Sequence, residues 1–433
     1  MNSKKLLIKR IICIVAVIVI VSVSLAYIGS LLQGRNKGAT CKLEYYENAD
    51  QYDVLMFGTS HMYNMVLPME LWDKYGITSF NWGYSNCTLA MDYYVMKNAI
   101  EHGNPKLCIV DIAGLTEYEN EGNGKYKNSE RGLARELFAS IPFSITKVRA
   151  VYDIFDDYDN RLDMLAPILY YHGRWNDITA EDLVRGKYYE KGAQYIPSLH
   201  KWGIRYEVPP HEDVAIDSKC FQYIFPMIEL CRKNGVEILF VYNPSATSEE
   251  GINNAYTMET VFASLGVPYL NMISADFITD YMDFAEDGGH LNYSGAMKLT
   301  DYIGAYVADN YPAIIDHRHD ADYSDWYEYY DNYVEYKKSV IQAETDFFTL
   351  LMLTYGDDFE KTVYIDSNCS VYEDQAYMWP FIHNGDSECE PIKVDDLELE
   401  GVPYPIVLEI RDAKTGELFY NRGFEVDESF DVD

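Results

Sequence analysis

From about residue 50 onward, short apolar runs alternate with longer helical segments, and this alternation restricts the folds open to the chain. The apolar runs, which we expect to be buried strands, lie at 52–58, 77–83, 107–114, 237–244 and 267–272. Apolar residues recur at helical spacing in four segments: Met91–His102, Phe221–Asn234, Asn253–Leu265 and Ser294–Asn310. Repeated strand-then-helix units predict an α/β fold in which helices cover both faces of a parallel sheet.

An uninterrupted apolar stretch near the N-terminus runs from Ile11 to about Leu32, which is long enough to span a bilayer. Four basic residues precede it: Lys4, Lys5, Lys9 and Arg10. Basic residues favour the cytoplasmic side, so we expect a single-pass type II anchor in the cell membrane, with the rest of the chain outside. A signal peptide cleaved near residues 24–26 is the alternative.

The chain divides into an anchor and a large α/β domain before its composition changes. Residues 1–35 are interpreted as a cytoplasmic tip and transmembrane anchor, and residues 45–318 as the α/β domain. An insertion at 115–215 separates the third and fourth expected strands and is too long for an ordinary connection. Such insertions often build a lid or binding wall, and a helix is expected to begin at residues 179–182.

Beyond residue 318 the chain becomes acidic and rich in tyrosine. Residues 319–355 are interpreted as a helical connector and residues 356–433 as a small β-rich accessory domain; HRH at 317–319 is interpreted as a polar linker. Strands are expected at 361–366, 377–382, 405–412 and 418–426. The last two resemble a hairpin with a turn at residues 414–416.

A net charge of −34 argues against nucleic acid or an anionic membrane surface as the main partner, because both would repel the chain. The same acidity is compatible with a cationic substrate. The 40 tyrosines either contact sugars or fill an amphipathic surface layer. Histidine and cysteine spacings match no zinc pattern, so we predict neither a metal nor a cofactor. Cys369 and Cys389 are the one pair suspected of forming a disulfide.

The motif Gly58-Thr59-Ser60-His61 comes directly after the first expected strand and before a helical segment. A serine there lies at the carboxyl edge of the sheet, where ligands bind in open parallel sheets. The helix N-terminus that follows supplies amide donors and a field that favours a developing oxyanion. Taken alone, Ser60 could instead only cap this helix.

A second motif, Asp287-Gly288-Gly289-His290, comes just before the last helix of the α/β domain. A hydroxyl nucleophile needs a base, and the base needs an acceptor that holds its tautomer and offsets its positive charge. This spacing lets one loop deliver both His290 and Asp287. Together the two motifs predict a catalytic triad of Ser60, His290 and Asp287.

These motifs resemble those of the SGNH hydrolase superfamily, which has a nucleophilic serine in its first block and DxxH in its last. The resemblance implies a three-layer, flavodoxin-like SGNH domain. Within that superfamily the chain is similar to membrane-anchored surface proteins of teichoic-acid D-alanylation and exopolysaccharide O-acetylation. The likeness is carried by GTSHMYNMVLP, SFNWGYSNC, the RW of the insertion and DFAEDGGHLNYSGA, within residues 50–312. It implies a membrane-bound O-acyltransferase partner and a surface polysaccharide substrate.

In the same superfamily, a glycine of the second block and an asparagine of the third help to form the oxyanion hole. Gly83 matches the second block, but no Gly-x-Asn-Asp follows the third strand. The expected donors are therefore the backbone amides of Ser60 and Gly83, with Asn86 as a side-chain donor.

Several further residues are candidate substrate contacts. His61 adjoins the nucleophile, where capping, support of the site or substrate contact are all open, and Asn292 follows the triad histidine. Arg174 and Trp175 either line an entrance or pin the insertion onto the core. Asp283, one helical turn before Asp287, is expected to be solvated.

The residues together favour acyl transfer at the cell surface: a serine esterase or O-acyltransferase that works through an acyl-enzyme. With the resemblance, the expected acceptor is a cell-surface polysaccharide or a teichoic-acid-like polymer. A non-catalytic assembly component of a surface acylation complex is the main alternative, since the third block is imperfect. A carbohydrate deacetylase or lipase would use the same residues with a different acceptor.

Overall fold

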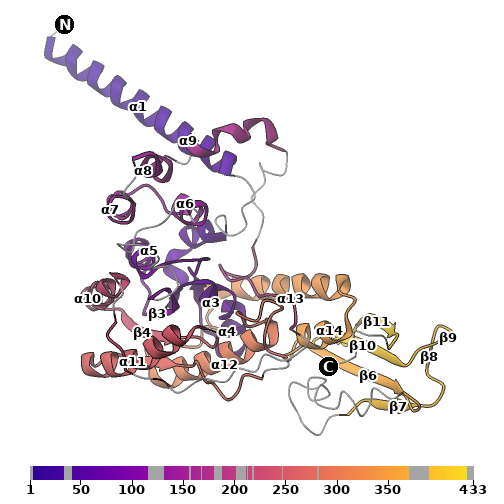
Figure 1. Ribbon diagram of the computed structural model, residues 1–433. Helices are drawn as coiled ribbons and strands as arrows, with labels where there is room; N and C mark the ends of the chain where they lie inside the picture. Colours follow the sequence, from indigo (N-terminus) through magenta and orange to yellow (C-terminus); the bar gives the residue numbers. More distant parts are fainter. Residues whose placement is uncertain are drawn as a thin grey trace.

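Five parallel strands form the central sheet of the structure, which is a computed structural model (Figure 1). In chain order they are β1 (Val54–Phe57), β2 (Ser79–Asn81), β3 (Leu107–Asp111), β4 (Glu237–Tyr242) and β5 (Tyr269–Asn271). Their spatial order is β2-β1-β3-β4-β5, so β1 lies between β2 and β3. This confirms the expected parallel sheet and all five of its strands, each shorter than its apolar run because the ends of the run enter turns.

The structure describes residues 3–33, 41–115, 131–155, 158–166, 168–179, 188–200, 211, 213–216, 219–245, 247–279, 282–369 and 390–426. The expected strand at 377–382 and all but the first residue of the helix start expected at 179–182 lie outside these ranges. The suspected disulfide stays a prediction, because Cys389 also lies outside them.

Helices cover both faces of the sheet, and alternate strand residues point into two separate cores. Leu55, Val110 and Phe240 pack against α5 (Leu89–His102), α10 (Ile224–Asn234) and α11 (Glu249–Leu265). Residues of the opposite parity pack against α12 (Tyr293–Asn310) and α4 (Pro68–Tyr75). The pleat sends successive side chains to opposite faces, which explains why the strands are apolar throughout.

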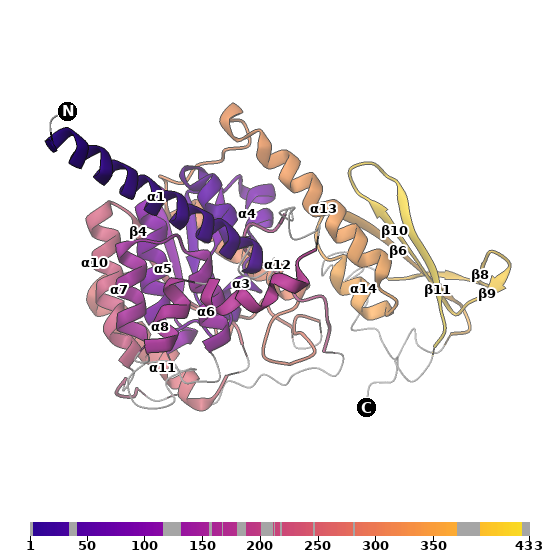
Figure 2. The ribbon, with the colours of Figure 1, turned by 90° about the horizontal axis from the view of Figure 1, so that it is seen from above.

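The N-terminal helix α1 (Ser3–Gln33) projects from the rest of the chain (Figures 1 and 2). Within it, Lys5–Gly29 is long and apolar enough to cross a membrane, with a mean hydropathy of 3.1. The end of α1 meets the insertion: Gly29 packs against Ile168, and the Arg174 guanidinium donates to the Leu32 carbonyl at 2.8 Å. A cation at a helix C-terminus also interacts favourably with the helix dipole.

The described part of the insertion is helical. Its elements are α6 (Arg131–Ser140), α7 (Ile145–Ile154), α8 (Tyr158–Leu165), α9 (Ile168–Tyr171) and the 3₁₀ helix His172–Asp177. Helix α7 packs on α5, which covers the central sheet. The insertion therefore links the sheet domain to the end of α1.

The connector is a packed part of the fold and not an exposed spacer. Its helix α13 (Asp325–Ala343) crosses beside α4, and α14 (Phe347–Leu353) follows it (Figure 2). Trp326 is buried against Trp72 at a ring distance of 5.2 Å. One continuous apolar core runs from the central sheet through these helices to the C-terminal strands.

A buried ion cluster fixes α13 to the sheet domain. The Lys337 ammonium contacts the Glu70 carboxylate at 3.1 Å, the Tyr293 hydroxyl at 2.8 Å and the Asp358 carboxylate. Burial alone would lower the pKa of Lys337, but the carboxylates of Asp358 and Glu70 hold it well above its ordinary value. Lys337 is therefore charged, and it joins α13 to α4, α12 and the start of the C-terminal sheet.

The C-terminal strands form a four-stranded sheet in the order β11-β10-β6-β7. Its strands are β6 (Phe359–Asp366), β7 (Ile392–Val394), β10 (Ile406–Asp412) and β11 (Leu418–Phe424). The short strands β8 (Glu398–Leu399) and β9 (Val402–Pro403) form a separate two-stranded pair. The expected hairpin is present between β10 and β11, where Gly416 has a φ of 71°. Three of the four strands expected in this region are thus confirmed.

The interpretation of residues 317–319 as a polar linker is wrong for its first residue. His317 is buried, its Nε2 contacts the Asp53 carboxylate at 3.0 Å, and its ring stacks on Tyr323. A charged run in the sequence does not show that one of its members faces inward.

We predict that Lys337→Ala lowers the free energy of unfolding by about 3–5 kcal/mol, because it leaves two carboxylates without their buried cation. Chemical denaturation of the full chain in detergent micelles measures this. Lys414→Ala is the matched control, since Lys414 pairs with Asp331 at the surface and its loss should cost under about 1 kcal/mol. Equal losses in the two variants would contradict the prediction.

Candidate active site

Ser60 is the first residue of the short helix α3 (Ser60–Tyr63), which begins three residues after the end of β1. The helix cap is Thr59, whose hydroxyl accepts from the His61 amide at 3.2 Å. The reading of Ser60 as a cap is therefore wrong, and its side chain is left for another partner. That partner is His290, with 2.7 Å between Ser60 Oγ and His290 Nε2.

Gly58 makes the sharp turn from β1 into α3 possible. Its φ is +147°, and a Cβ there would lie 2.7 Å from the Cβ of Asp111 at the end of β3. Asp111 in turn accepts from the Thr59 hydroxyl at 3.2 Å and from the Ala113 amide at 3.2 Å. The neighbouring strand thus holds the residues that precede the serine.

The loop before α12 brings Asp287 and His290 together as expected. Asp287 Oδ2 lies 2.7 Å from His290 Nδ1, and its Oδ1 accepts from the amides of Gly289 and His290 at 3.0 and 3.1 Å. Burial would raise the pKa of Asp287, but the hydrogen bond and charge of His290 and these amides hold it below the ordinary value. An ionised Asp287 therefore orients His290 and offsets its positive charge.

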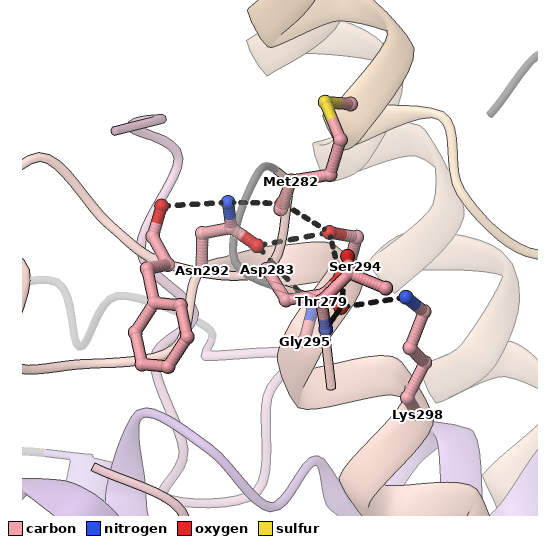
Figure 3. Close-up of polar contacts among 8 residues, drawn as sticks. Thr279, Met282, Asp283, Asn292, Ser294, Gly295 and Lys298 are labelled. Atoms are coloured by element: carbon pink, nitrogen blue, oxygen red, sulfur yellow. Dashed lines mark hydrogen bonds and ion pairs between the residues drawn. The ribbon is translucent and has the colours of Figure 1, made fainter. Parts of the chain in front are cut away.

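Buried polar contacts fix the base of this loop (Figure 3). The Asp283 carboxylate is fully buried and contacts the Thr279 amide and hydroxyl, the Ser294 hydroxyl and the Lys298 ammonium, the last at 2.6 Å. The expectation that Asp283 is solvated is wrong, because Lys298 from the next helix supplies its counter-charge.

Asn292 has a capping role in this structure, and its burial argues against the expected substrate contact. Its side-chain oxygen accepts from the Gly295 amide at 3.2 Å, and its nitrogen donates to the carbonyls of Met282 and Phe284 (Figure 3). Both ends of the amide are thus engaged in holding the loop to the start of α12.

His61 is buried beside the triad, with its ring 5.1 Å from the His290 ring. Burial, together with the neighbouring His290, lowers the pKa of His61 to about 3, although Asp287 opposes the shift. His61 is therefore neutral at physiological pH and packs against the histidine that contacts Ser60. Its backbone carbonyl accepts from the Asn243 side chain at 2.8 Å.

The predicted oxyanion hole needs one correction. The Gly83 amide donates to Asn81 Oδ1 at 2.9 Å, so it is not available to an oxyanion. The Ser60 amide belongs to the first turn of α3, where N–H groups have no partner within the helix. Asn86 lies in the turn after β2 with a left-handed φ of 55°.

Arg174 and Trp175 lie in the 3₁₀ helix His172–Asp177 of the insertion. Arg174 joins the insertion to the end of α1, which is neither of the two roles expected for it. The Trp175 side chain is 68% exposed in the same 3₁₀ helix. Among the described residues, no group of three or more His, Cys, Asp or Glu side chains is placed to hold a metal ion.

Sequence reasoning missed two polar side chains that support the site, Asp111 and Asn81. The Asn81 amide donates to the carbonyls of Met62 and Val66, both at 2.9 Å, and so ties the end of α3 and the chain after it to β2. Each is a polar residue at the carboxyl end of an apolar strand, beside the strand that carries the nucleophile. A polar residue at the end of an apolar run is therefore the sequence signal that points to each of them.

Comparison with known proteins gives only a remote likeness in fold. No protein-family model and no curated protein matches the sequence. A candidate acylhydrolase from Bacteroides fragilis is similar over 61% of this chain and 93% of its own, with 10% identity and a TM-score of 0.33. A candidate lipolytic protein of the G-D-S-L family from Desulfitobacterium hafniense is similar over 58% and 97%, with 12% identity and a TM-score of 0.30. At this level neither structure identifies the function of this chain.

Asp287→Asn should lower kcat for ester hydrolysis by about 10²- to 10⁴-fold, because the amide neither fixes the tautomer of His290 nor offsets its charge. Steady-state kinetics with p-nitrophenyl acetate measures this. Glu286→Gln, which neutralises the exposed neighbouring acid, is the control and should retain activity. A loss of similar size in both variants would show that only the charge of the loop matters.

Asp92 lies buried under the nucleophile turn, where its Oδ1 accepts from the Cys87 thiol at 3.2 Å. Burial raises the pKa of Asp92 to about 8, and the Asp111 carboxylate adds to the rise. The folded state therefore binds a proton that the unfolded chain releases near pH 4. The stability from this proton is complete below about pH 4 and is lost as the pH rises through about 8.

We predict that Asp92→Asn removes this part of the pH dependence. Between about pH 5 and 7 the unfolding free energy of the wild type should fall relative to that of the variant, by up to about 1.4 kcal/mol per pH unit. Chemical denaturation at a series of pH values tests this, with the exposed Asp331→Asn as control. Parallel curves for wild type and Asp92→Asn would contradict it.

Proposed function

We propose that this protein is a membrane-anchored, extracytoplasmic serine esterase or O-acyltransferase of the SGNH type. The observation that carries the proposal is the hydrogen-bond chain from Ser60 through His290 to Asp287, with 2.7 Å at each step. Nucleophile and base are within proton-transfer reach, and the base is oriented by a third group. These hydrogen-bonded side chains lie at the carboxyl edge of a parallel sheet, where open α/β folds bind ligands.

The reaction has two halves. Ser60 Oγ attacks the carbonyl carbon of an ester or thioester while its proton passes to His290 Nε2. The tetrahedral intermediate collapses to an acyl-enzyme, and the leaving group takes the proton from His290. A water or an acceptor hydroxyl then attacks the acyl carbon, His290 takes its proton and returns it to Ser60, and the serine is free again.

Oxyanion stabilisation is assigned to the Ser60 amide at the N-terminus of α3, with Asn86 as a second donor. The loss of one donor typically lowers kcat by about 10²- to 10³-fold, so an enzyme without the Gly83 donor is expected to hydrolyse simple esters slowly. Slow hydrolysis suits a transferase, which must keep its acyl-enzyme from water.

The proposed cellular location rests on the N-terminal segment. The basic residues before the apolar helix favour a type II orientation, which puts the sheet domain outside the cell. A surface polysaccharide as acceptor and a membrane-bound O-acyltransferase as partner rest on the resemblance of the sequence motifs. Binding of nucleic acid is disfavoured by the net charge of −34.

A non-catalytic assembly role is the second candidate, and the engaged Gly83 amide favours it. An assembly protein would need the helices that join α1, the sheet domain and the C-terminal strands, but not the nucleophile. Direct trapping of the serine distinguishes the two functions.

The full chain in detergent micelles should form an adduct on Ser60 with a serine-directed phosphonate, located by mass spectrometry. Ser60→Ala should abolish the adduct, and His290→Ala should slow its formation and lower kcat by on the order of 10⁴-fold or more, because no base takes the proton. His172→Ala, an exposed histidine of the insertion, is the control and should label like the wild type. Full labelling of His290→Ala, or no adduct in the wild type, would favour the assembly role.

A further inference from the structure

A cavity of about 230 Å³ lies beside the nucleophile helix. Its lining includes Tyr63, Tyr84, Glu190, Gln194 and Tyr336. These residues come from α3, the turn after β2, the end of the insertion and α13. The cavity is therefore built only when the sheet domain, the insertion and the connector are packed together.

One lining residue of the cavity, Tyr63, lies a single helical turn from the serine. Tyr63 follows Ser60 by three residues in α3, a rise of roughly 4.5 Å along the helix axis. Gly83 also lines the cavity, and a Cβ on it would lie 2.8 Å from the Tyr63 amide. The backbone after β2 thus lies against α3 at Tyr63, one helical turn from the serine, while Ser60 and His290 are themselves outside the lining.

Two walls of the cavity are held in place by buried polar contacts. The buried Lys42 ammonium donates to the carbonyls of Asn81 at 2.6 Å and Gly192 at 2.7 Å, which ties the end of the insertion to the edge strand β2. The backbone of Gln194 is held by its backbone amide, which donates to the Tyr63 carbonyl at 2.9 Å. Tyr336 precedes Lys337, whose buried ion cluster holds α13 in place.

The lining combines tyrosine rings with hydrogen-bonding groups. The Tyr63 and Ser85 hydroxyls are 2.8 Å apart, and Glu190 and Gln194 add a carboxylate and an amide. Such rings bury an apolar face and keep a polar edge, which suits a ring that has C–H faces and hydroxyls around its rim. The volume is below the roughly 300–1,000 Å³ of sites for drug-sized ligands, so one ring fits better than a long acyl chain.

The charges of the protein also restrict which ligands can bind in the cavity. In the part of the chain that the structure describes, the lining contains one carboxylate, that of Glu190, and one ammonium, that of Lys42. The Lys42 ammonium is already engaged by the carbonyls of Asn81 and Gly192. With that cation engaged and a net charge of −34 on the chain, the field disfavours a polyol phosphate but not a neutral sugar.

We propose that this cavity binds one neutral sugar ring of the acyl acceptor, with Tyr336 of α13 as a wall that the sheet domain cannot supply. The inference rests on the proposed function and names its acceptor site. A hydroxyl of the bound sugar gives its proton to His290 Nε2 as its oxygen forms a bond to the acyl carbon. The bond from that carbon to Ser60 Oγ breaks, and Ser60 Oγ takes the proton back.

Binding is tested without chemistry, in the full chain carrying Ser60→Ala. Saturation-transfer NMR in detergent micelles, with maltotetraose, cellotetraose and chitotetraose as probes and glycerol 3-phosphate as the anionic comparison, should show binding of at least one saccharide. Adding Tyr336→Ala should weaken that binding at least tenfold, and Gln194→Ala, an exposed site that the fold tolerates, by a few fold. Tyr327→Ala, an exposed tyrosine of the same helix outside the cavity, is the matched control and should bind like the parent.

The outcomes separate this inference from the proposed function. Failure of all three saccharides to bind, preference for glycerol 3-phosphate, or equal binding by all variants would overturn the inference even if the phosphonate labels Ser60. Saccharide binding that depends on Tyr336 and Gln194 supports the cavity even if no adduct forms. In that case the chain holds a glycan but does not transfer acyl groups to it.

Discussion

The parallel pairing of β1 between β2 and β3 is the constraint on which the site depends. Val54 lies opposite both Ser79 and Leu107, so the three strands end side by side. The turn that carries Ser60, the turn after β2 and the Asp111 carboxylate therefore meet at one edge. Parallel strands send all their carboxyl ends in one direction, and residues distant in sequence converge there without further design.

A second feature of the structure is that the segment after the sheet domain packs against that domain. Lys337 from α13 holds Glu70, Tyr293 and Asp358 in one buried cluster, and Trp326 packs on Trp72. A buried ion cluster often gives no more net stability than apolar residues of the same volume would. We therefore interpret this cluster as a device that specifies how the elements are placed, since each charge must meet its partner. The connector contributes a wall of the proposed sugar site for the same reason.

The site itself shows how charge is managed near a nucleophile. Asp287 is held ionised by His290 and two backbone amides, while Asp92 and Asp111 lie buried below the turn. His61 stays neutral next to His290 because it is buried. The one carboxylate that must carry charge is the most exposed of these groups, where ionisation costs least.

The sequence by itself determined the sheet, its helices and the Ser60, Asp287 and His290 motifs, because apolar periodicity and short motif spacing are local properties. Only the tertiary structure decided that the Gly83 amide is bound by Asn81, that Asp283 is buried with Lys298, and that His317 faces inward. These depend on partners brought together by packing, which no periodicity encodes. The role of α13 is of the same kind, since its polar, tyrosine-rich sequence resembles a solvated spacer until Lys337 meets carboxylates from distant segments.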